Sequence, residues 1–189
     1  MFMIEHKIAL VSIDRVRPHE CVVEERVREL LRDLVSLPVL RKPVVVDEET
    51  LTLLDGHHRL KALRRLGVEL IPAALVKYSD PRIVVRRWGS GEIIEKRLVV
   101  ERAMEGRLFP PKTTRHLVAL NGGEVHISEV VPEVNVHLKD LLEYSVLRSE
   151  LKAMAALAAG SSGGAAPTGS RARRRGISPR EKRRTTPPP

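Results

Sequence analysis

The sequence predicts an α+β domain with a small mixed sheet and flanking helices. Short β-branched runs, such as 7–13 and 71–77, alternate with segments whose apolar residues recur at helical spacing. The chain of 189 residues is long enough for one domain with a sizeable core, which we place at residues 1–150. Beyond it the composition changes to Ala, Gly and Ser and then to Arg and Pro. We therefore expect residues 151–189 to form a disordered basic tail.

Turn residues and helix stop signals divide the domain into its elements. Arg17-Pro18 ends the first strand and leads into a loop with His19 and Glu20. Ser90 can cap a helix, and Gly67 and Gly106 can end one. The expected strands are 7–13, 43–46, 50–54, 71–77, 83–88, 125–130 and 134–138, and the expected helices are 22–35, 59–66, 91–105 and 138–147.

Charge is distributed unevenly along the chain. The net charge is +9, but residues 161–189 carry eight Lys or Arg against one acid, so most of the excess lies in the tail. Such a tail would hold nucleic acid without sequence preference, chiefly through its basic residues at 171–184, or would serve as a solubilising extension. One cysteine allows no intramolecular disulfide, and no run reaches the roughly 20 apolar residues of a membrane span. We expect a cytoplasmic protein with no membrane partner.

The stretch from Leu53 to Leu60 contains the strongest chemical signal, because a short apolar run ends in Asp55-Gly56-His57-His58-Arg59 and then opens a helix. A helix start offers unpaired N–H groups and a positive dipole end, and glycine lets the backbone approach a bound group. Arginine adds a planar cation to a phosphate, whereas an aspartate would repel it unless a divalent cation lay between them. The stretch therefore predicts a nucleotide with Mg²⁺.

Two other interpretations of this stretch remain open. One Gly and one Arg at a helix start also fit an ordinary structural turn, although the adjacent His57 and His58 disfavour it. A zinc site is the second alternative. Adjacent histidines lack the usual ligand spacing, and Cys21 alone supplies no thiolate cluster, so we disfavour zinc.

A second chemical stretch runs from Phe109 to His116. If its extended form continues, Lys112, Thr114 and His116 share one face of the backbone, while Thr113 and Arg115 share the other. An amine, a hydroxyl and an imidazole on one side would suit a small anion or an amino acid. The alternative is a polar edge strand that faces water.

Taken together, these stretches resemble the ParB/sulfiredoxin superfamily, and most closely the free L-serine kinases of archaea. Three blocks carry the resemblance: Arg17-Pro18-His19-Glu20, Asp55 to Arg59, and Pro111-Lys112-Thr113-Thr114-Arg115-His116. Trp88, at the end of an expected strand, falls where these kinases have a substrate-facing tryptophan. The resemblance covers roughly residues 8–145 and implies a ParB/sulfiredoxin-like fold that phosphorylates L-serine with ADP or ATP and Mg²⁺.

The resemblance also implies roles for particular residues. Glu20 would be the base that takes the proton of the serine hydroxyl, although an acid before a helix also simply favours the helix dipole. Asp55 would hold Mg²⁺ or help to orient the reacting groups. The nucleotide's phosphates would be held by Gly56, His57, His58 and Arg59, and the serine pocket would be shaped by Trp88, Lys112, Thr114, Arg115 and His116.

Some features of the chain depart from this superfamily. Sulfiredoxins carry a reactive cysteine where this chain has His57, and partition ParB proteins carry an arginine-rich motif and a helix-turn-helix that are not evident here. The segment between Trp88 and Phe109 has about twenty residues, where the kinases have a larger insertion. Two further hypotheses are a ParB-like, nucleotide-switched nucleic-acid-binding regulator and a kinase for another hydroxyl compound.

Overall fold

The structure is a computed structural model, and it describes residues 4–160. Its main sheet has four strands in the order β1-β5-β3-β4, in which β3 and β5 run parallel and the other neighbours antiparallel. These strands are β1 (His6–Ser12), β3 (Val44–Asp47), β4 (Leu53–Asp55) and β5 (Leu70–Val76). A second sheet, in the order β6-β7-β8, contains β6 (Ile83–Arg87), β7 (Thr114–Leu120) and β8 (Gly123–His126). The expected small mixed α+β fold is confirmed.

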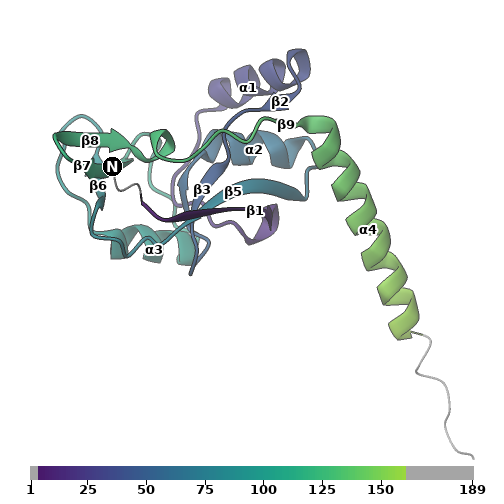
Figure 1. Cartoon of the computed structure of the whole chain (residues 1–189). Coiled ribbons are helices and arrows are strands. Elements are labelled where there is room, and N and C mark those ends of the chain that lie inside the picture. Colours follow the sequence, from purple (N-terminus) through teal and green to yellow (C-terminus); the bar gives the residue numbers. More distant parts are fainter. Residues whose placement is uncertain (1–3, 161–189) are drawn as a thin grey trace, which may run out of the picture.

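Helices and short connecting elements surround the two sheets (Figure 1). The helices are α1 (Glu24–Ser36), α2 (His57–Arg65), α3 (Lys96–Glu105) and α4 (Leu138–Gly160), with short 3₁₀ turns η1 (Ile13–Arg15) and η2 (Ile127–Glu129). A two-stranded ladder joins β2 (Val39–Leu40) to β9 (Val136–His137).

The main sheet separates two hydrophobic clusters, because alternate residues of its strands point to opposite faces. Val44 and Val46 of β3 pack with α1, α2 and the start of α4, whereas Val45 packs with the second sheet and α3. All three valines are fully buried. The site described below lies where β4 and α2 meet residues 19–23 and the start of β7.

β2 and residues 117–120 of β7 lie outside every expected strand, and three expected elements have clearly different bounds. The helix expected at 91–105 begins only at Lys96, because Gly91 has a positive φ of 73° and Ile94 N–H returns to Val85 O of β6 at 2.9 Å. Ser90 therefore does not cap it. The strand expected at 125–130 stops at His126, where η2 begins.

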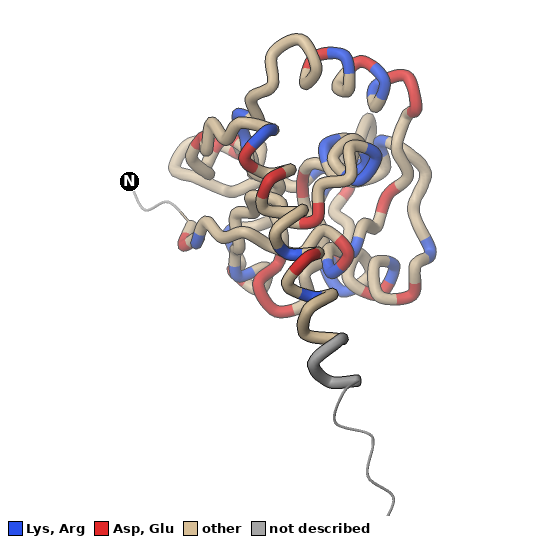
Figure 2. The backbone as a smooth tube through the Cα atoms, turned by 90° about the vertical axis from the view of Figure 1, so that its right-hand side faces the viewer, with Lys and Arg blue, Asp and Glu red and all other residues tan. Residues whose placement is uncertain are grey.

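The third difference concerns the C-terminal part of the chain. The helix expected at 138–147 continues to Gly160, so residues 151–160 are helical and not part of a disordered tail. Good helix formers, Leu, Lys, Ala and Met, fill this extension. Residues 161–189, which carry most of the net positive charge, lie outside the described residues. Within the described body, acidic and basic residues are interspersed (Figure 2). None of the described helices has the length and apolarity that a membrane crossing requires.

Candidate functional site

The start of α2 is shaped as the sequence predicts. β4 ends at Asp55, Gly56 is the N-cap residue with φ of 102°, and α2 begins at His57. A Cβ atom at Gly56 would lie 2.9 Å from Val44 Cγ1 and 3.3 Å from Arg59 Nη2, so only glycine fits here without displacement. The first turn has no acidic residue and no side-chain cap. Its N–H groups therefore remain suited to an anion.

Asp55 and Arg59 form an ion pair across this helix start. Arg59 Nη2 donates to Asp55 Oδ2 at 2.5 Å, and Nη1 donates to the carbonyl oxygens of Lys42 and Pro43 at 2.7 and 2.5 Å. Both side chains are about one-fifth exposed. Arg59 is thus anchored to β4 and to the segment just before β3, and a phosphate would meet a guanidinium that is already oriented.

The Glu20 carboxylate is held by the segment that leads into β7. Its Oε1 accepts from Lys112 N–H at 2.7 Å. Its Oε2 accepts from Thr113 N–H at 3.1 Å, Thr114 N–H at 2.8 Å and Thr114 Oγ1 at 2.8 Å. A β-bridge between Glu20 and Phe109 aligns the two segments. The first and third blocks of the sequence, more than 90 residues apart, therefore meet at one carboxylate.

Both histidines of α2 hold the loop that carries Glu20. His57 Nε2 accepts from His19 N–H at 3.4 Å, and His58 Nε2 accepts from Val23 N–H at 3.1 Å. Because each Nε2 is an acceptor, a neutral ring carries its proton on Nδ1 and can still donate there. Burial lowers the pKa of His57 well below its usual value and lowers that of His58, although the charge of Glu20 opposes the shift at His58.

A second pair of histidines lies behind Glu20 in the interior. His19 Nε2 lies 2.8 Å from Thr114 Oγ1, and since that hydroxyl donates to Glu20, the His19 ring donates to it. Burial lowers the pKa of His19 to about 4. His116 is 1% exposed, lies 2.9 Å from the Tyr78 hydroxyl through Nε2, and also has a lowered pKa through burial. Neutral histidines therefore support the acidic group from within.

Three of the residues expected to bind substrate, Thr114, Arg115 and His116, lie in β7 and point to its two faces. Thr114 and His116 point inward, whereas Arg115 is exposed and its guanidinium lies 5.1 Å from the Trp88 ring centre. The alternation expected along this stretch is present from Thr114 to His116. Lys112, however, precedes the strand in a turn with φ of 58°, so only its backbone N–H reaches Glu20, and its side chain is exposed.

Sequence reasoning missed His126 and gave no role to His19. His126 Nε2 lies 3.9 Å from Asp55 Oδ1, and its Nδ1 lies 2.8 Å from Ser128 Oγ. His126 stands seventy residues from the central motif with no neighbouring pattern, so no sequence signal points to it. His19 was visible inside the Pro-His-Glu block, but only the fold shows that it supports Thr114.

Cavities border the helix start on two sides. One, of about 560 Å³, lies between α1 and β2 and reaches Arg59 and Lys42. The other, of about 310 Å³, is lined by Glu20 and His57 together with Glu24 and Lys61. Arg59 of the first turn of α2 thus borders the larger cavity, and His57 borders the smaller one together with Glu20.

Asp55 is the carboxylate at the site best placed to hold a metal. Its Oδ1 faces His126 at 3.9 Å, whereas Oδ2 is paired with Arg59. Among residues 4–160, no group of three or more His, Cys, Asp or Glu gathers as a metal cluster. Mg²⁺ is commonly bound by one or two carboxylates together with substrate phosphates, so a single free aspartate oxygen fits such an ion.

Known proteins that are similar to this chain include a ParB-like protein and serine kinases. No family model matches the chain. It is 35% identical over 91 residues to a "ParB-like protein" of Sulfolobus acidocaldarius, covering 46% of this chain and 43% of that protein. It is 30% identical over 83 residues to an "ATP-dependent L-serine kinase" of Staphylothermus marinus, covering 42% and 33%. Over 166 residues it is 22% identical to an "ADP-dependent L-serine kinase" of Thermococcus kodakarensis, covering 75% and 69%.

The fold of the chain is similar to that of a solved structure. The chain superimposes on "Free serine kinase in complex with AMP" with a TM-score of 0.60 and 16% identity, covering 71% of this chain and 93% of that one. The chain has the fold of free serine kinase. Together with its ParB-like and serine-kinase relatives, this confirms the resemblance to the ParB/sulfiredoxin superfamily. The matches to the first two relatives span less than half of those proteins.

Proposed function

We propose that this protein is a free L-serine kinase that makes O-phospho-L-serine with ADP or ATP as phosphoryl donor. The observation that carries the proposal is the convergence of three distant segments. The loop with Glu20 is bonded to both histidines of α2 and to residues 112–114. The names of the serine-kinase relatives support the same substrate and donor.

The start of α2 is our proposed site for the nucleotide's phosphates. The N–H groups of its first turn, the Nδ1–H groups of His57 and His58, and the fixed guanidinium of Arg59 would supply donors around Gly56. Mg²⁺ at Asp55, when bound, would neutralise charge on the phosphates. Phosphoryl transfer depends mainly on positioning and charge neutralisation, so these groups form a sufficient set.

Glu20 is our proposed general base, and the structure distinguishes its two oxygens. Oε2 accepts three hydrogen bonds, whereas Oε1 accepts one, from Lys112 N–H. We therefore assign Oε1 as the atom that takes the serine hydroxyl proton. The serine oxygen then bonds to the terminal phosphorus, the bond from that phosphorus to the bridging oxygen breaks, and the shortened nucleotide leaves.

The remaining site residues would define the acceptor pocket. Thr114 and His19 would hold the Glu20 carboxylate in place, with His116 and Tyr78 packed behind them. Trp88, stacked with Arg115, would form the exposed wall, and the Lys112 side chain would approach from the turn. Since these groups would also suit other small hydroxyl compounds, L-serine must be compared with L-threonine and glycerate as acceptors.

The test is direct measurement of product. The full-length protein, incubated with L-serine, Mg²⁺ and either ADP or ATP, should form O-phosphoserine. Glu20→Gln should lower kcat by about 10²- to 10⁴-fold, the range of general-base catalysis, and leave nucleotide affinity nearly unchanged.

Glu24→Gln is the matched control, because Glu24 lines the same cavity as Glu20 but pairs with Arg65. It should keep near-normal turnover. Absence of O-phosphoserine with both nucleotides would contradict the kinase proposal, whereas normal turnover in Glu20→Gln would contradict only the assigned base.

A ParB-like, nucleotide-switched nucleic-acid-binding regulator is the second candidate, favoured by the 35% identity to the ParB-like protein. Its anchor would be the basic residues at 171–184. Deletion of residues 161–189 separates the two proposals. A kinase should keep its activity, whereas the regulator should lose most of its DNA or RNA affinity and its steep salt dependence.

A further inference from the structure

His126 stands where the second sheet faces the start of α2. It is the last residue of β8 and the N-cap residue of η2, so its backbone belongs to the second sheet. Its ring nevertheless approaches the end of β4, because Nε2 lies 3.9 Å from Asp55 Oδ1. Beyond η2 the chain runs on to β9 (Figure 1). His126 therefore brings a side chain of the second sheet to the proposed phosphate site.

Ser128 determines which nitrogen of the His126 ring carries a hydrogen. Ser128 N–H donates to Nδ1 at 3.3 Å, and the Ser128 hydroxyl lies 2.8 Å from the same nitrogen. Because Nδ1 accepts, a neutral ring carries its hydrogen on Nε2, and a protonated ring carries one there as well. Nε2 therefore faces Asp55 as a hydrogen-bond donor. A nitrogen that carries a hydrogen has no lone pair for a cation, so His126 is not suited to bind the metal itself.

Lys42 connects the turn after His126 to Arg59. The Lys42 Nζ donates to Ser128 O at 3.2 Å, and the Lys42 carbonyl oxygen accepts from Arg59 Nη1 at 2.7 Å. Arg59 in turn pairs with Asp55 Oδ2, whereas His126 faces Oδ1. The His126 ring and the Arg59 guanidinium are thus held in place through one residue, and they face the two oxygens of one carboxylate.

The Nε2–H group of His126 lacks an acceptor among residues 4–160. The 3.9 Å to Asp55 Oδ1 exceeds the length of a hydrogen bond, and no other polar atom of these residues bonds to this nitrogen. The side chain is 29% exposed, so a ligand can reach it. An oriented donor beside a helix start, with the Arg59 guanidinium at the other oxygen of Asp55, suits a phosphate oxygen.

We propose that His126 donates from Nε2 to a phosphate oxygen of the bound nucleotide. This assignment rests on the nucleotide site proposed above and adds to it a donor from the second sheet. The phosphates would then be held from the main sheet by the start of α2 and from the second sheet by His126. Because the contact is made to phosphate, it should contribute to the binding of ADP and not to the binding of adenosine.

Calorimetric titration of the full-length protein tests this assignment. In the presence of Mg²⁺, His126→Ala should raise the dissociation constant for ADP about 10-fold or more, as expected for the loss of a hydrogen bond to a charged group. The dissociation constant for adenosine should change by less than about twofold. His126→Gln should stay within about threefold of the wild type, because its amide N–H can replace the Nε2–H of the ring.

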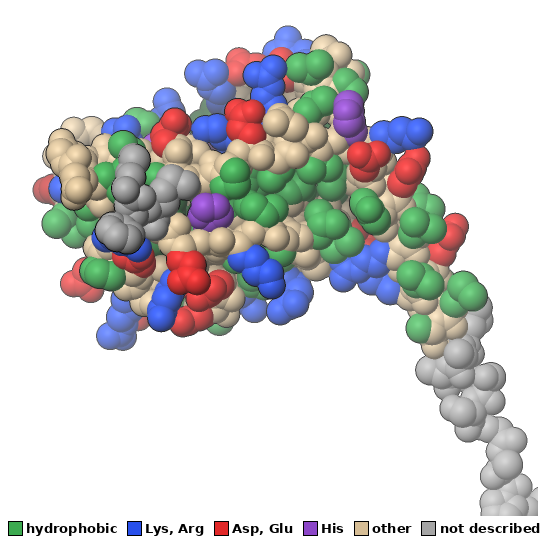
Figure 3. Space-filling view, in the orientation of Figure 1, with side chains coloured by type: hydrophobic (Ala, Val, Ile, Leu, Met, Phe, Trp, Pro, Cys, Tyr) green, Lys and Arg blue, Asp and Glu red, His purple; other side chains and the backbone are tan. Residues whose placement is uncertain are grey.

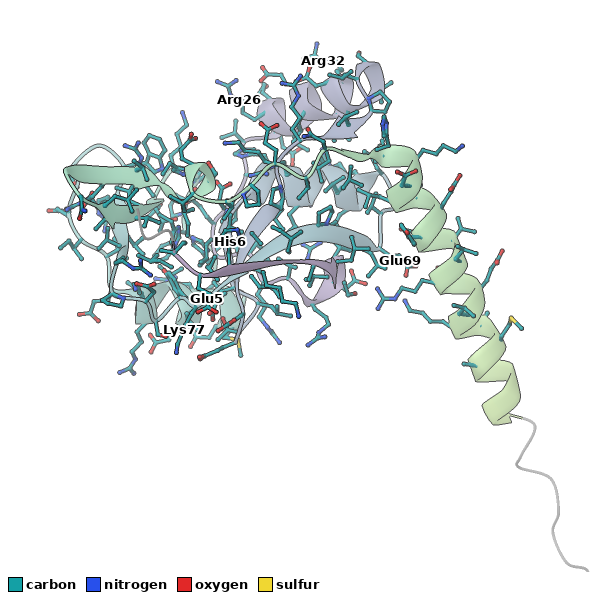
Figure 4. All side chains as sticks on the ribbon, viewed as in Figure 1. Glu5, His6, Arg26, Arg32, Glu69 and Lys77 are labelled. Carbon is teal, nitrogen blue, oxygen red and sulfur yellow. The ribbon has the colours of Figure 1, made fainter. Side chains whose placement is uncertain are left out.

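His6→Ala is the matched control. His6 is also partly exposed, and its Nδ1 also bonds close by in the sequence, to Ile4 O at 3.2 Å. It lies on β1, which β5 and β3 separate from β4 (Figure 4). This variant should change the dissociation constant for ADP by less than about twofold. Circular dichroism should show that both histidine variants remain folded.

A double-mutant cycle separates a direct contact from an effect through Asp55. In an Asp55→Asn background no carboxylate remains to be positioned, yet His126→Ala should still weaken ADP binding about 10-fold. A loss that disappears in this background would overturn the assignment. So would wild-type affinity in His126→Ala, an equal loss for adenosine, an equal loss in His6→Ala, or a His126→Gln variant as weak as His126→Ala.

The same titrations distinguish this assignment from the proposed function. A wild type that binds no ADP would overturn the proposed nucleotide site together with this assignment. A wild type that binds ADP and forms O-phosphoserine, with unchanged ADP affinity in His126→Ala, would overturn the assignment of His126 alone.

Discussion

The corner where Glu20 meets residues 112–114 and the start of α2 differs from the projecting part of α4. At the corner, polar groups find partners from distant segments, whereas on α4 large apolar side chains remain exposed (Figure 3). At the corner, the carboxylate accepts four hydrogen bonds from residues 112–114, and the loop beside it is bonded to His57 and His58. On α4, the side chains of Tyr144, Leu147, Leu151 and Met154 are between 51% and 67% exposed. Long-range hydrogen bonds fix the position of the Glu20 carboxylate, whereas the large apolar side chains on the outer part of α4 stay exposed.

The largest effect expected at the corner is a loss of stability in acid. Burial lowers the pKa of His19 to about 4 and lowers that of His57, His58 and His116, while unfolded histidines titrate near 6.5. These rings therefore contribute stability that is fully present above pH 6.5 and is lost as the pH falls toward 4. For His19 alone the loss is about 3 kcal/mol.

Urea unfolding between pH 7.5 and 4 would measure this loss. His58→Gln should flatten the dependence of the unfolding free energy on pH, because one partly buried imidazole with a lowered pKa is removed. His137→Gln, at an exposed histidine, should leave it unchanged. If the unfolding free energy depends on pH equally in the wild type and in His58→Gln, His58 does not contribute to the loss of stability in acid.

Gly56→Ala should destabilise the domain by about 2 kcal/mol, because its φ of 102° strains an L-residue and the new Cβ would press on Val44. Unfolding in urea checks the stability, and titration with ADP checks the anion site, which should weaken. Gly122→Ala is the control for strain alone, since its φ is 101° but a Cβ there would meet nothing within 4 Å. Equal losses in the two variants would exclude a role for the contact with Val44.

Thr114→Val should cost about 1.5 kcal/mol of stability and lower kcat, because Glu20 loses one donor and His19 loses its buried acceptor. Thr113→Val is the matched control. Its hydroxyl donates to Pro110 O, while its backbone N–H still donates to Glu20. If both variants lose the same turnover, the bridge from His19 to Glu20 does not position the carboxylate.

Lys152→Ala should have the smallest effect, below about 0.5 kcal/mol, because its ion pair with Glu69 is exposed. Thermal unfolding at low and high salt would measure it. A loss above about 1 kcal/mol that salt does not weaken would mean that the outer part of α4 is fixed to the body more firmly than an exposed ion pair allows.

Local residue preferences were enough to predict several elements of the fold from the sequence. The strand-to-helix turn at Asp55-Gly56 was predicted because a short apolar run and a glycine have strong local preferences. The helical extension of α4 through 151–160 was predicted wrongly, because its small residues suit both a helix and a disordered chain. Likewise, Ser90 is a good cap by type, yet the turn at Gly91 directs the backbone along β6 instead.

The sequence by itself determined the α+β class, the helix start at Gly56 and the three polar blocks, because these follow from local backbone preferences and from residue types. Only the tertiary structure decided that Glu20 is held by Lys112, Thr113 and Thr114, that His19 lies behind Thr114, and that His126 approaches Asp55. Contacts between segments seventy or more residues apart depend on how the two sheets pack. They therefore produce no repeating pattern of residue types from which they could be predicted.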